Sequence, residues 1–214
     1  MESIELRQVT PDAFGGRELS GSEVWQTERT FGRGEVCLVE AVSGAGKSSL
    51  CGYLYGYRKD YRGTIAFDGK DIRKWGRGEW RECRNNRLSM LFQDLRLFPE
   101  LTASENIKLK NRLTHYKSKE WIRTAFERVG IADKWESPAG KLSFGQQQRV
   151  ALIRALCQPF DFILLDEPVS HLDAANSRVV GELLSEEVRQ RGAGLILTSI
   201  GLHPLLKYDK TLRL

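Results

Sequence analysis

The chain has few cysteines and no long apolar run, and each shortage excludes a class of protein. Four cysteines among 214 residues form no CxxC pair, so the sequence offers neither a disulfide frame nor a zinc site. No apolar stretch approaches the roughly 18 residues that cross a bilayer as a helix. The first residues lack the basic start and the apolar core of a signal peptide. We therefore expect a cytosolic protein with buried, reduced thiols.

The formal net charge of +5 does not by itself indicate a partner. Lysines and arginines are scattered among acids, apart from a mild cluster: Arg73, Lys74, Arg77, Arg81, Arg84 and Arg87. A solvated face explains this cluster better than a nucleic-acid groove does, so we expect no nucleic-acid partner.

Apolar patterning predicts strands near the amino end and alternating strands and helices toward the carboxyl end. Ser3 to Val9 and Glu23 to Phe31 alternate in polarity, which is typical of antiparallel strands. Mostly apolar stretches predict further strands at 34–40, 63–67, 87–92, 162–165 and 194–198. Helices are predicted at 47–55, from Ala103 with Thr102 as its cap, and at 119–129, 144–156 and 174–191. Such alternation favours a mostly parallel, doubly wound sheet with a helical insertion at about 102–141.

The segment from Ala41 to Ser48 follows a predicted strand and opens a predicted helix, as a phosphate-binding loop requires. Gly44 and Gly46 allow backbone N–H groups to surround phosphates, and the helix start adds its positive dipole end. Lys47 can reach the β and γ phosphates, and the Ser48 hydroxyl can bind Mg²⁺. Ala41 stands where the motif has its first glycine. If that position needs a positive φ, alanine costs about 1 kcal/mol or more.

Two acids, Asp166 and Glu167, follow the apolar strand at 162–165. Ligands bind at the carboxyl edge of a doubly wound sheet, so both acids are predicted to face a ligand. Asp166 is then placed to hold Mg²⁺, and Glu167 is placed to act as a general base on the attacking water.

In their order along the chain, these motifs resemble those of the nucleotide-binding subunits of ABC transporters. The matching segments are Gly44 to Ser48, Gln93, Leu142 to Gln146, Asp166-Glu167 and Ser170 to Asp173. The resemblance implies an α/β P-loop NTPase with a mostly parallel core sheet, an N-terminal antiparallel β subdomain and an inserted helical lobe. It implies one domain over 1–214, in which 1–92 and 143–214 form the ATP-binding core and 93–142 form the lobe.

The resemblance also implies the cofactors, ATP and Mg²⁺, and the roles of site residues. Glu167, Gln93 and Lys47 would be catalytic, and Ser48, Gln93 and Asp166 would hold the metal. The nucleotide would be bound by Ser43, Gly44, Ala45, Gly46, Lys47, Ser48 and Ser49, and by Ser143, Gly145 and Gln146 of the opposite subunit. Phe14 stands where the family has an aromatic residue stacked on adenine, with core packing as the alternative.

The segments from Phe92 to Pro99 and from Leu101 to Asn106 are most similar in sequence to one branch of that family. The branch includes lipoprotein-releasing, macrolide-exporter and cell-division ATPases, in which dimer closure moves a separate permease. The implied partners are an integral-membrane permease, contacted near 92–100, and a second ATPase subunit, identical or not. The implied location is the cytoplasmic face of the membrane.

Three departures from the family pattern lead to an alternative function. Ala41 and Phe144 replace glycines, and Ser199 replaces the switch histidine, with His203 as a distant substitute. The main expectation is an ATPase that drives a permease, and the alternative is an ATP-binding switch with little hydrolysis. Soluble DNA-repair and translation ATPases are disfavoured, because the segment from Gln93 to Ser143 is short and the chain has one cassette.

Overall fold

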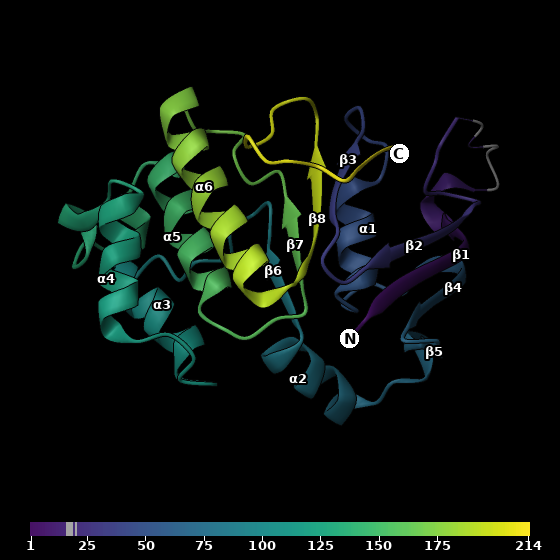
Figure 1. The fold of residues 1–214 in the computed structure, drawn as a ribbon, viewed down its shortest axis with the longest axis horizontal. Helices are drawn as coiled ribbons and strands as arrows, with labels where there is room; N and C mark the ends of the chain where they lie inside the picture. Colours follow the sequence, from purple (N-terminus) through teal and green to yellow (C-terminus); the bar gives the residue numbers. More distant parts are fainter. Residues whose placement is uncertain (16–18, 20) are drawn as a thin grey trace.

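The computed structural model describes residues 1–15, 19 and 21–214 as two sheets with helices packed around them (Figure 1). An antiparallel sheet has the strand order β2-β1-β4-β5, and the core sheet has the order β6-β7-β8-β3-β9. The antiparallel strands are β1 (Ser3–Pro11), β2 (Glu28–Gly32), β4 (Tyr61–Phe67) and β5 (Lys70–Asp71). The core strands are β3 (Val36–Glu40), β6 (Leu88–Leu91), β7 (Phe162–Asp166), β8 (Gly194–Ser199) and β9 (Lys210–Arg213).

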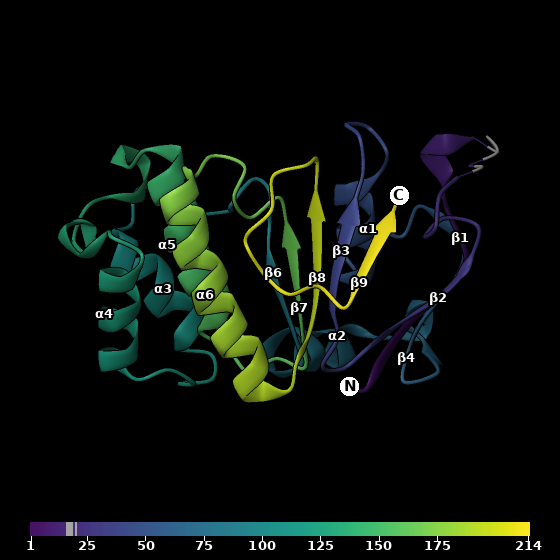
Figure 2. The same ribbon diagram turned by 45° about the horizontal axis from the view of Figure 1, so that its top comes forward.

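All neighbouring strands of the core sheet are parallel, so their carboxyl ends share one edge (Figure 2). The α-helices are α1 (Lys47–Leu54), α2 (Arg77–Asn86), α3 (Ala103–Asn111), α4 (Lys119–Arg128), α5 (Phe144–Leu156) and α6 (Ala174–Arg191). The connections into α1 and from β7 into α6 leave from the carboxyl edge, which is where ligands bind in such sheets.

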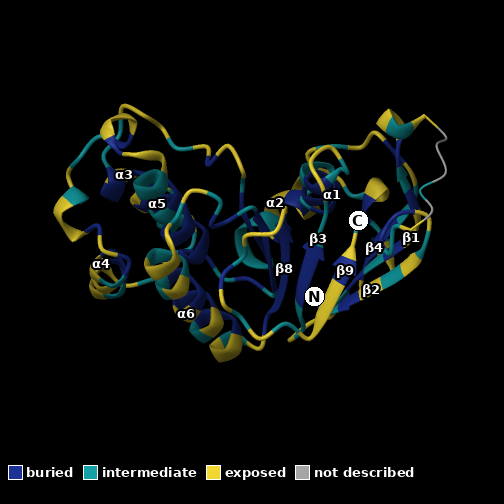
Figure 3. Cartoon of the chain, turned by 90° about the horizontal axis from the view of Figure 1, so that it is seen from above, coloured by how far each residue is buried: buried dark blue, intermediate teal, exposed yellow. Residues whose placement is uncertain are grey.

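Successive residues of the core strands pack into two different apolar clusters, because side chains alternate across a sheet. Leu38 and Leu197 belong to a cluster with α5, α6 and the helical lobe. Val39 and Ile196 belong to a second cluster with α1 and the antiparallel sheet. The central strands β7 and β8 are therefore buried on both faces, whereas the edge strand β9 and the outer side of α6 are exposed (Figure 3).

The helical lobe consists of α3 and α4, and side-chain caps define where its helices begin. Thr102 accepts a hydrogen bond from the Glu105 amide, and Glu105 accepts one from the Thr102 amide. Ser118 caps α4 in a similar way, through the Trp121 amide. The predicted Thr102 cap and the predicted inserted lobe are confirmed.

The predicted antiparallel strand from Glu23 to Phe31 is wrong in its first half. β2 begins only at Glu28. Val24 and Trp25 are both buried although they are consecutive, and Gln26 has a φ of 56°, so the segment turns instead of extending. Helix α2 and the edge strand β9 were not predicted from the sequence.

All four cysteines are buried free thiols, as predicted. Burial raises the pKa of Cys51 well above its ordinary value and raises that of Cys37 to about 12, so both stay protonated and unreactive.

Candidate functional site

The loop between β3 and α1 has the backbone of a phosphate-binding loop. Gly44 and Gly46 have φ values of 81° and 97°, which other residues rarely adopt. A Cβ at Gly46 would also lie 3.2 Å from the rings of Phe14 and Trp25. The Trp25 indole donates a hydrogen bond to the Ala45 carbonyl at 3.1 Å, which ties the loop to the turn before β2. This role of Trp25 was not predictable from the sequence.

Lys47 and Glu167 face each other across the carboxyl edge. The Lys47 ammonium lies 3.5 Å from a Glu167 carboxylate oxygen, and both side chains are largely buried. The ammonium also donates to the Val42 carbonyl at 3.3 Å. The predicted phosphate-binding lysine and the predicted base are thus adjacent.

Ala41 is unstrained, so the free-energy cost of a positive φ at an alanine does not arise. It is not among the residues with a positive φ. Its amide donates to the Ser199 carbonyl at 3.0 Å, as an ordinary extension of the β3–β8 ladder. Alanine therefore replaces glycine here without a conformational penalty.

Three oxygen-bearing side chains predicted to hold a metal line one cavity of about 300 Å³: Ser48, Gln93 and Asp166. The Ser48 hydroxyl donates to the Gln93 side-chain carbonyl at 2.9 Å. Asp166 is 3% exposed and accepts a hydrogen bond from Thr198 at 2.7 Å. Hydroxyl, amide and carboxylate oxygens are the donors that Mg²⁺ prefers, so the residues present fit this ion.

The backbone of Glu167 is held in a left-handed conformation, with a φ of 52°. Its amide donates to the Thr198 carbonyl at 3.0 Å. Its carbonyl accepts hydrogen bonds from the Gln148 side chain at 2.9 Å and from the Ser170 hydroxyl at 3.3 Å. Such a conformation costs on the order of 1 kcal/mol and persists only where neighbours enforce it. Thr198 and Gln148 thus support the site. In the sequence, each stands out only as a polar residue within a mostly apolar strand or helix.

A second cavity, of about 780 Å³, opens between the phosphate loop and the amino-terminal segment. Its lining includes Phe14, Trp25, Ser43, Gly44 and Ala45. Phe14 is half-buried and also packs against the apolar cluster of α1. Its two expected roles, adenine stacking and core packing, are thus compatible in one position. Ser49 lies on α1, where its hydroxyl accepts a hydrogen bond from Arg58 at 2.8 Å.

The Leu142 to Gln146 segment forms the start of α5. Ser143 caps the helix through the Gln146 amide at 3.3 Å, and the Gln146 side chain accepts from the Ser143 amide at 3.0 Å. Gly145 lies against the loop after β7, where a Cβ would meet the His171 carbonyl oxygen at 2.9 Å. Among the described residues, Ser143, Gly145 and Gln146 line neither cavity of the phosphate loop.

Ser199 is fully buried and is engaged in its own turn. Its hydroxyl donates to the Leu202 carbonyl at 2.6 Å and accepts from the Gly201 amide at 3.0 Å. His203 packs its ring against Tyr208, with ring centroids 5.2 Å apart. Neither contact directs these side chains toward Glu167 or Lys47.

Comparison with known proteins decides the family. A family model described as ABC transporter matches residues 26–170. The chain is 33% identical over 199 residues to the lipoprotein-releasing system ATP-binding protein LolD of Geobacter metallireducens, covering 92% of this chain and 88% of that protein. The chain belongs to the ABC transporter family.

Other relatives of this ABC chain agree on the subunit type. It is 31% identical over 185 residues to the ABC transporter ATP-binding protein YtrE of Bacillus subtilis, covering 85% of this chain and 80% of that one. The dimeric structure of MJ0796, a bacterial ABC transporter cassette, superimposes with a TM-score of 0.76 at 26% identity, covering 92% of this chain and 88% of that one. The predicted fold, a P-loop NTPase with a parallel core sheet, is confirmed.

This ABC chain is an ATP-binding subunit and an ATPase. A similar cassette, at a TM-score of 0.74 and 26% identity, has been solved in a post-hydrolysis state bound to ADP and Pi. The alternative of an ATP-binding switch with little hydrolysis is not supported. In the described part of the chain, no helix is both long and apolar enough to span a membrane.

Proposed function

We propose that the site at the carboxyl edge hydrolyses ATP with Glu167 as the general base and Lys47 as the phosphate-binding cation. The observation that supports this most is the 3.5 Å approach of Lys47 to Glu167, beside the cavity that Gln93 lines. With a γ-phosphate between them, Lys47 would neutralise its charge, and Glu167 would take the proton of the attacking water. Gln93 would help to orient that water.

Mg²⁺ would be held by Ser48, Gln93 and Asp166, and when bound it neutralises charge on the β and γ phosphates. Thr198 keeps the Asp166 carboxylate oriented through its 2.7 Å hydrogen bond. The hydrogen bond between the Ser48 hydroxyl and the Gln93 side-chain carbonyl holds both groups at one point of the cavity.

The nucleotide would lie along the loop, with its phosphates on the backbone N–H groups of 43–49 and its adenine against Phe14. Ser143, Gly145 and Gln146 would contact ATP held by a second ATPase subunit. Their distance from both cavities of their own phosphate loop supports this arrangement, as does the dimeric state of the similar cassette.

Replacing Lys47 with alanine is expected to weaken ATP binding at least tenfold and to remove measurable turnover, because the β and γ phosphates lose their cation. Isothermal titration with ATP measures the first effect and phosphate release measures the second. Lys59→Ala is the matched control, since Lys59 is an exposed lysine on the loop after α1. Equal ATP affinity in the Lys47 and Lys59 variants would contradict the proposed site.

We further propose that a membrane permease docks in a groove beside the site. The groove has a volume of about 280 Å³, and its lining includes Phe92, Phe98, Leu109 and Leu113. Phe98 and Leu113 remain 55% and 58% exposed on the same groove, and an exposed apolar patch marks a contact surface. The groove coincides with the 92–100 segment predicted to contact the permease. The lipoprotein-releasing relatives favour a permease of that branch, and such docking places the chain at the cytoplasmic face of a membrane.

Phe98→Ser is expected to reduce the share of the chain that sediments with membranes when it is expressed from its own locus. The change removes an exposed apolar anchor without touching the nucleotide site. Leu205→Ser is the matched control, because Leu205 is 75% exposed on another surface. If both variants sediment like the wild type, the groove is not the docking surface.

A further inference from the structure

The aromatic ring of Phe144, the first residue of α5, lies on the imidazole ring of His171. The ring centroids are 4.3 Å apart, and the ring planes are inclined at 57°. Phe144 is still 42% exposed, so it is not a residue of the apolar core. The contact joins the start of α5 to the loop that follows β7.

The neighbouring residue brings the same two segments into contact a second time. A Cβ at Gly145 would lie 2.9 Å from the His171 carbonyl oxygen and 3.3 Å from the Leu172 side chain. Only glycine allows this approach of the two backbones. The loop after β7 is therefore packed on the first turn of α5 at two successive residues.

Hydrogen bonds continue this contact to the proposed base. The His171 Nδ1 atom lies 2.9 Å from the Ser170 hydroxyl, and that hydroxyl donates to the Glu167 carbonyl at 3.3 Å. Gln148, one turn along α5 from Phe144, donates to the same carbonyl at 2.9 Å. Helix α5 thus holds the left-handed backbone of Glu167 both directly and through the loop.

We propose that Phe144 is a positioning residue for ATP hydrolysis, which acts through His171 and Ser170 on the orientation of Glu167. This rests on the proposed role of Glu167 as the base. A strained backbone keeps its conformation only while its surroundings enforce it. Without the Phe144 ring, the loop gains freedom and the Glu167 carboxylate spends less time aimed at the attacking water. Turnover falls, while the affinity of the chain's own phosphate loop for ATP stays unchanged because that loop is untouched.

The ring contact itself is tested by proton NMR on the purified full-length chain. The chain has three histidines, and an aromatic ring shifts only the imidazole signals beside it. Phe144→Leu is expected to move the His171 ring protons, assigned with His171→Asn, and to leave those of His115 and His203 in place. If no histidine signal moves, the contact does not exist and the proposal is overturned.

Steady-state ATP turnover tests the consequence. Phe144→Ala is expected to lower kcat about tenfold and to change KM for ATP less than about twofold, since small misplacements of a reacting group are costly. Phe144→Tyr keeps the ring and is expected to restore the rate. Tyr116→Ala is the matched control: this ring, in the loop between α3 and α4, is also 42% exposed and packs against Arg191 of α6. Its rate is expected to equal that of the wild type.

A double-mutant cycle shows whether Phe144 acts through His171. His171→Ala is expected to cause the same loss as Phe144→Ala, and the double variant no further loss. If the kcat loss of the double variant equals the product of the two single losses, the proposal is overturned. An unchanged or higher kcat in Phe144→Ala would overturn it as well. Glu167→Gln in the same assay separates the two hypotheses: if it turns over normally, the proposed function fails. If it is inactive while Phe144→Ala turns over normally, only the positioning role fails.

Discussion

Glu167→Gln is expected to lower kcat for ATP about 10²- to 10⁴-fold, the range that a lost general base costs. Glutamine has nearly the shape of glutamate but cannot accept the proton of the attacking water. The Glu167 carbonyl keeps its hydrogen bonds from Gln148 and Ser170, so the backbone stays in place. Phosphate release at saturating ATP measures the effect.

ATP binding is expected to survive this change, because the carboxylate of Glu167 repels phosphate while Lys47 attracts it. The dissociation constant of the Gln variant should equal or fall below that of the wild type. Glu182→Gln is the control, since Glu182 lies exposed on α6 beside Arg178. Turnover in the Glu167 variant at the level of the Glu182 variant would rule Glu167 out as the base.

Part of the candidate site was predictable because parallel strands bring distant residues to one edge. Ser48 lies on the helix after β3, Asp166 ends β7, and both line one cavity. Gln93 lines the same cavity, but only the family resemblance pointed to it. Their supporting partners were not predictable. Gln148 and Thr198 are polar residues within apolar elements, and only tertiary packing determines which groups they meet.

The errors in the fold have a similar physical origin. The stretch from Glu23 to Phe31 alternates in polarity, but Trp25 turns inward to bond the phosphate loop, and this interaction overrides the strand pattern. Helix α2 buries only Trp80 and Cys83, so its apolar periodicity is short. Strand β9 buries only Leu212, because it lies at the edge of the sheet. Elements with little buried surface leave little trace in a sequence.

The second large effect concerns stability and a buried ion cluster that joins the helical lobe to α6. Glu187 accepts hydrogen bonds from Lys117 at 2.7 Å and 2.8 Å and from Arg191 at 3.0 Å. The three side chains are 4%, 11% and 9% exposed, respectively. Glu187→Gln keeps the shape but leaves two buried cations uncompensated. We expect a loss of about 3 kcal/mol in the free energy of unfolding, or about 9 °C in Tm for a chain of this size.

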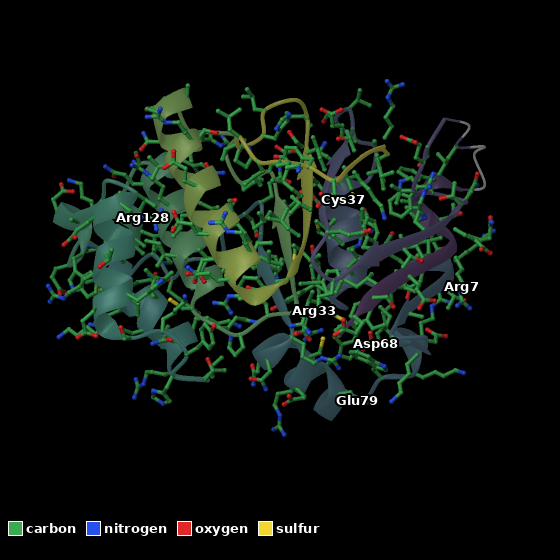
Figure 4. All side chains as sticks on the ribbon, viewed as in Figure 1. Arg7, Arg33, Cys37, Asp68, Glu79 and Arg128 are labelled. Carbon is green, nitrogen blue, oxygen red and sulfur yellow. The ribbon has the colours of Figure 1, made fainter. Side chains whose placement is uncertain are left out.

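The adjacent residue supplies the control. Glu186 pairs at 2.7 Å with Arg128, which lies on α4 (Figure 4). The side chains of Glu186 and Arg128 are 42% and 33% exposed, respectively. Glu186→Gln is therefore expected to cost less than about 1 kcal/mol. Equal melting temperatures for the two variants, measured by circular dichroism, would show that the buried cluster contributes no more than a surface pair.

The pH dependence of the Glu187 variant provides an independent check. Burial lowers the pKa of Lys117 below its ordinary value of 10.5, and the hydrogen bond to Glu187 opposes this effect. Without Glu187 the pKa of Lys117 falls further, so between that lowered pKa and 10.5 the unfolded chain binds more protons than the folded one. Stability then rises with pH in this range, and the rise is expected to be steeper in Glu187→Gln than in the wild type. A slope no steeper than that of the wild type would mean that Glu187 does not keep Lys117 charged.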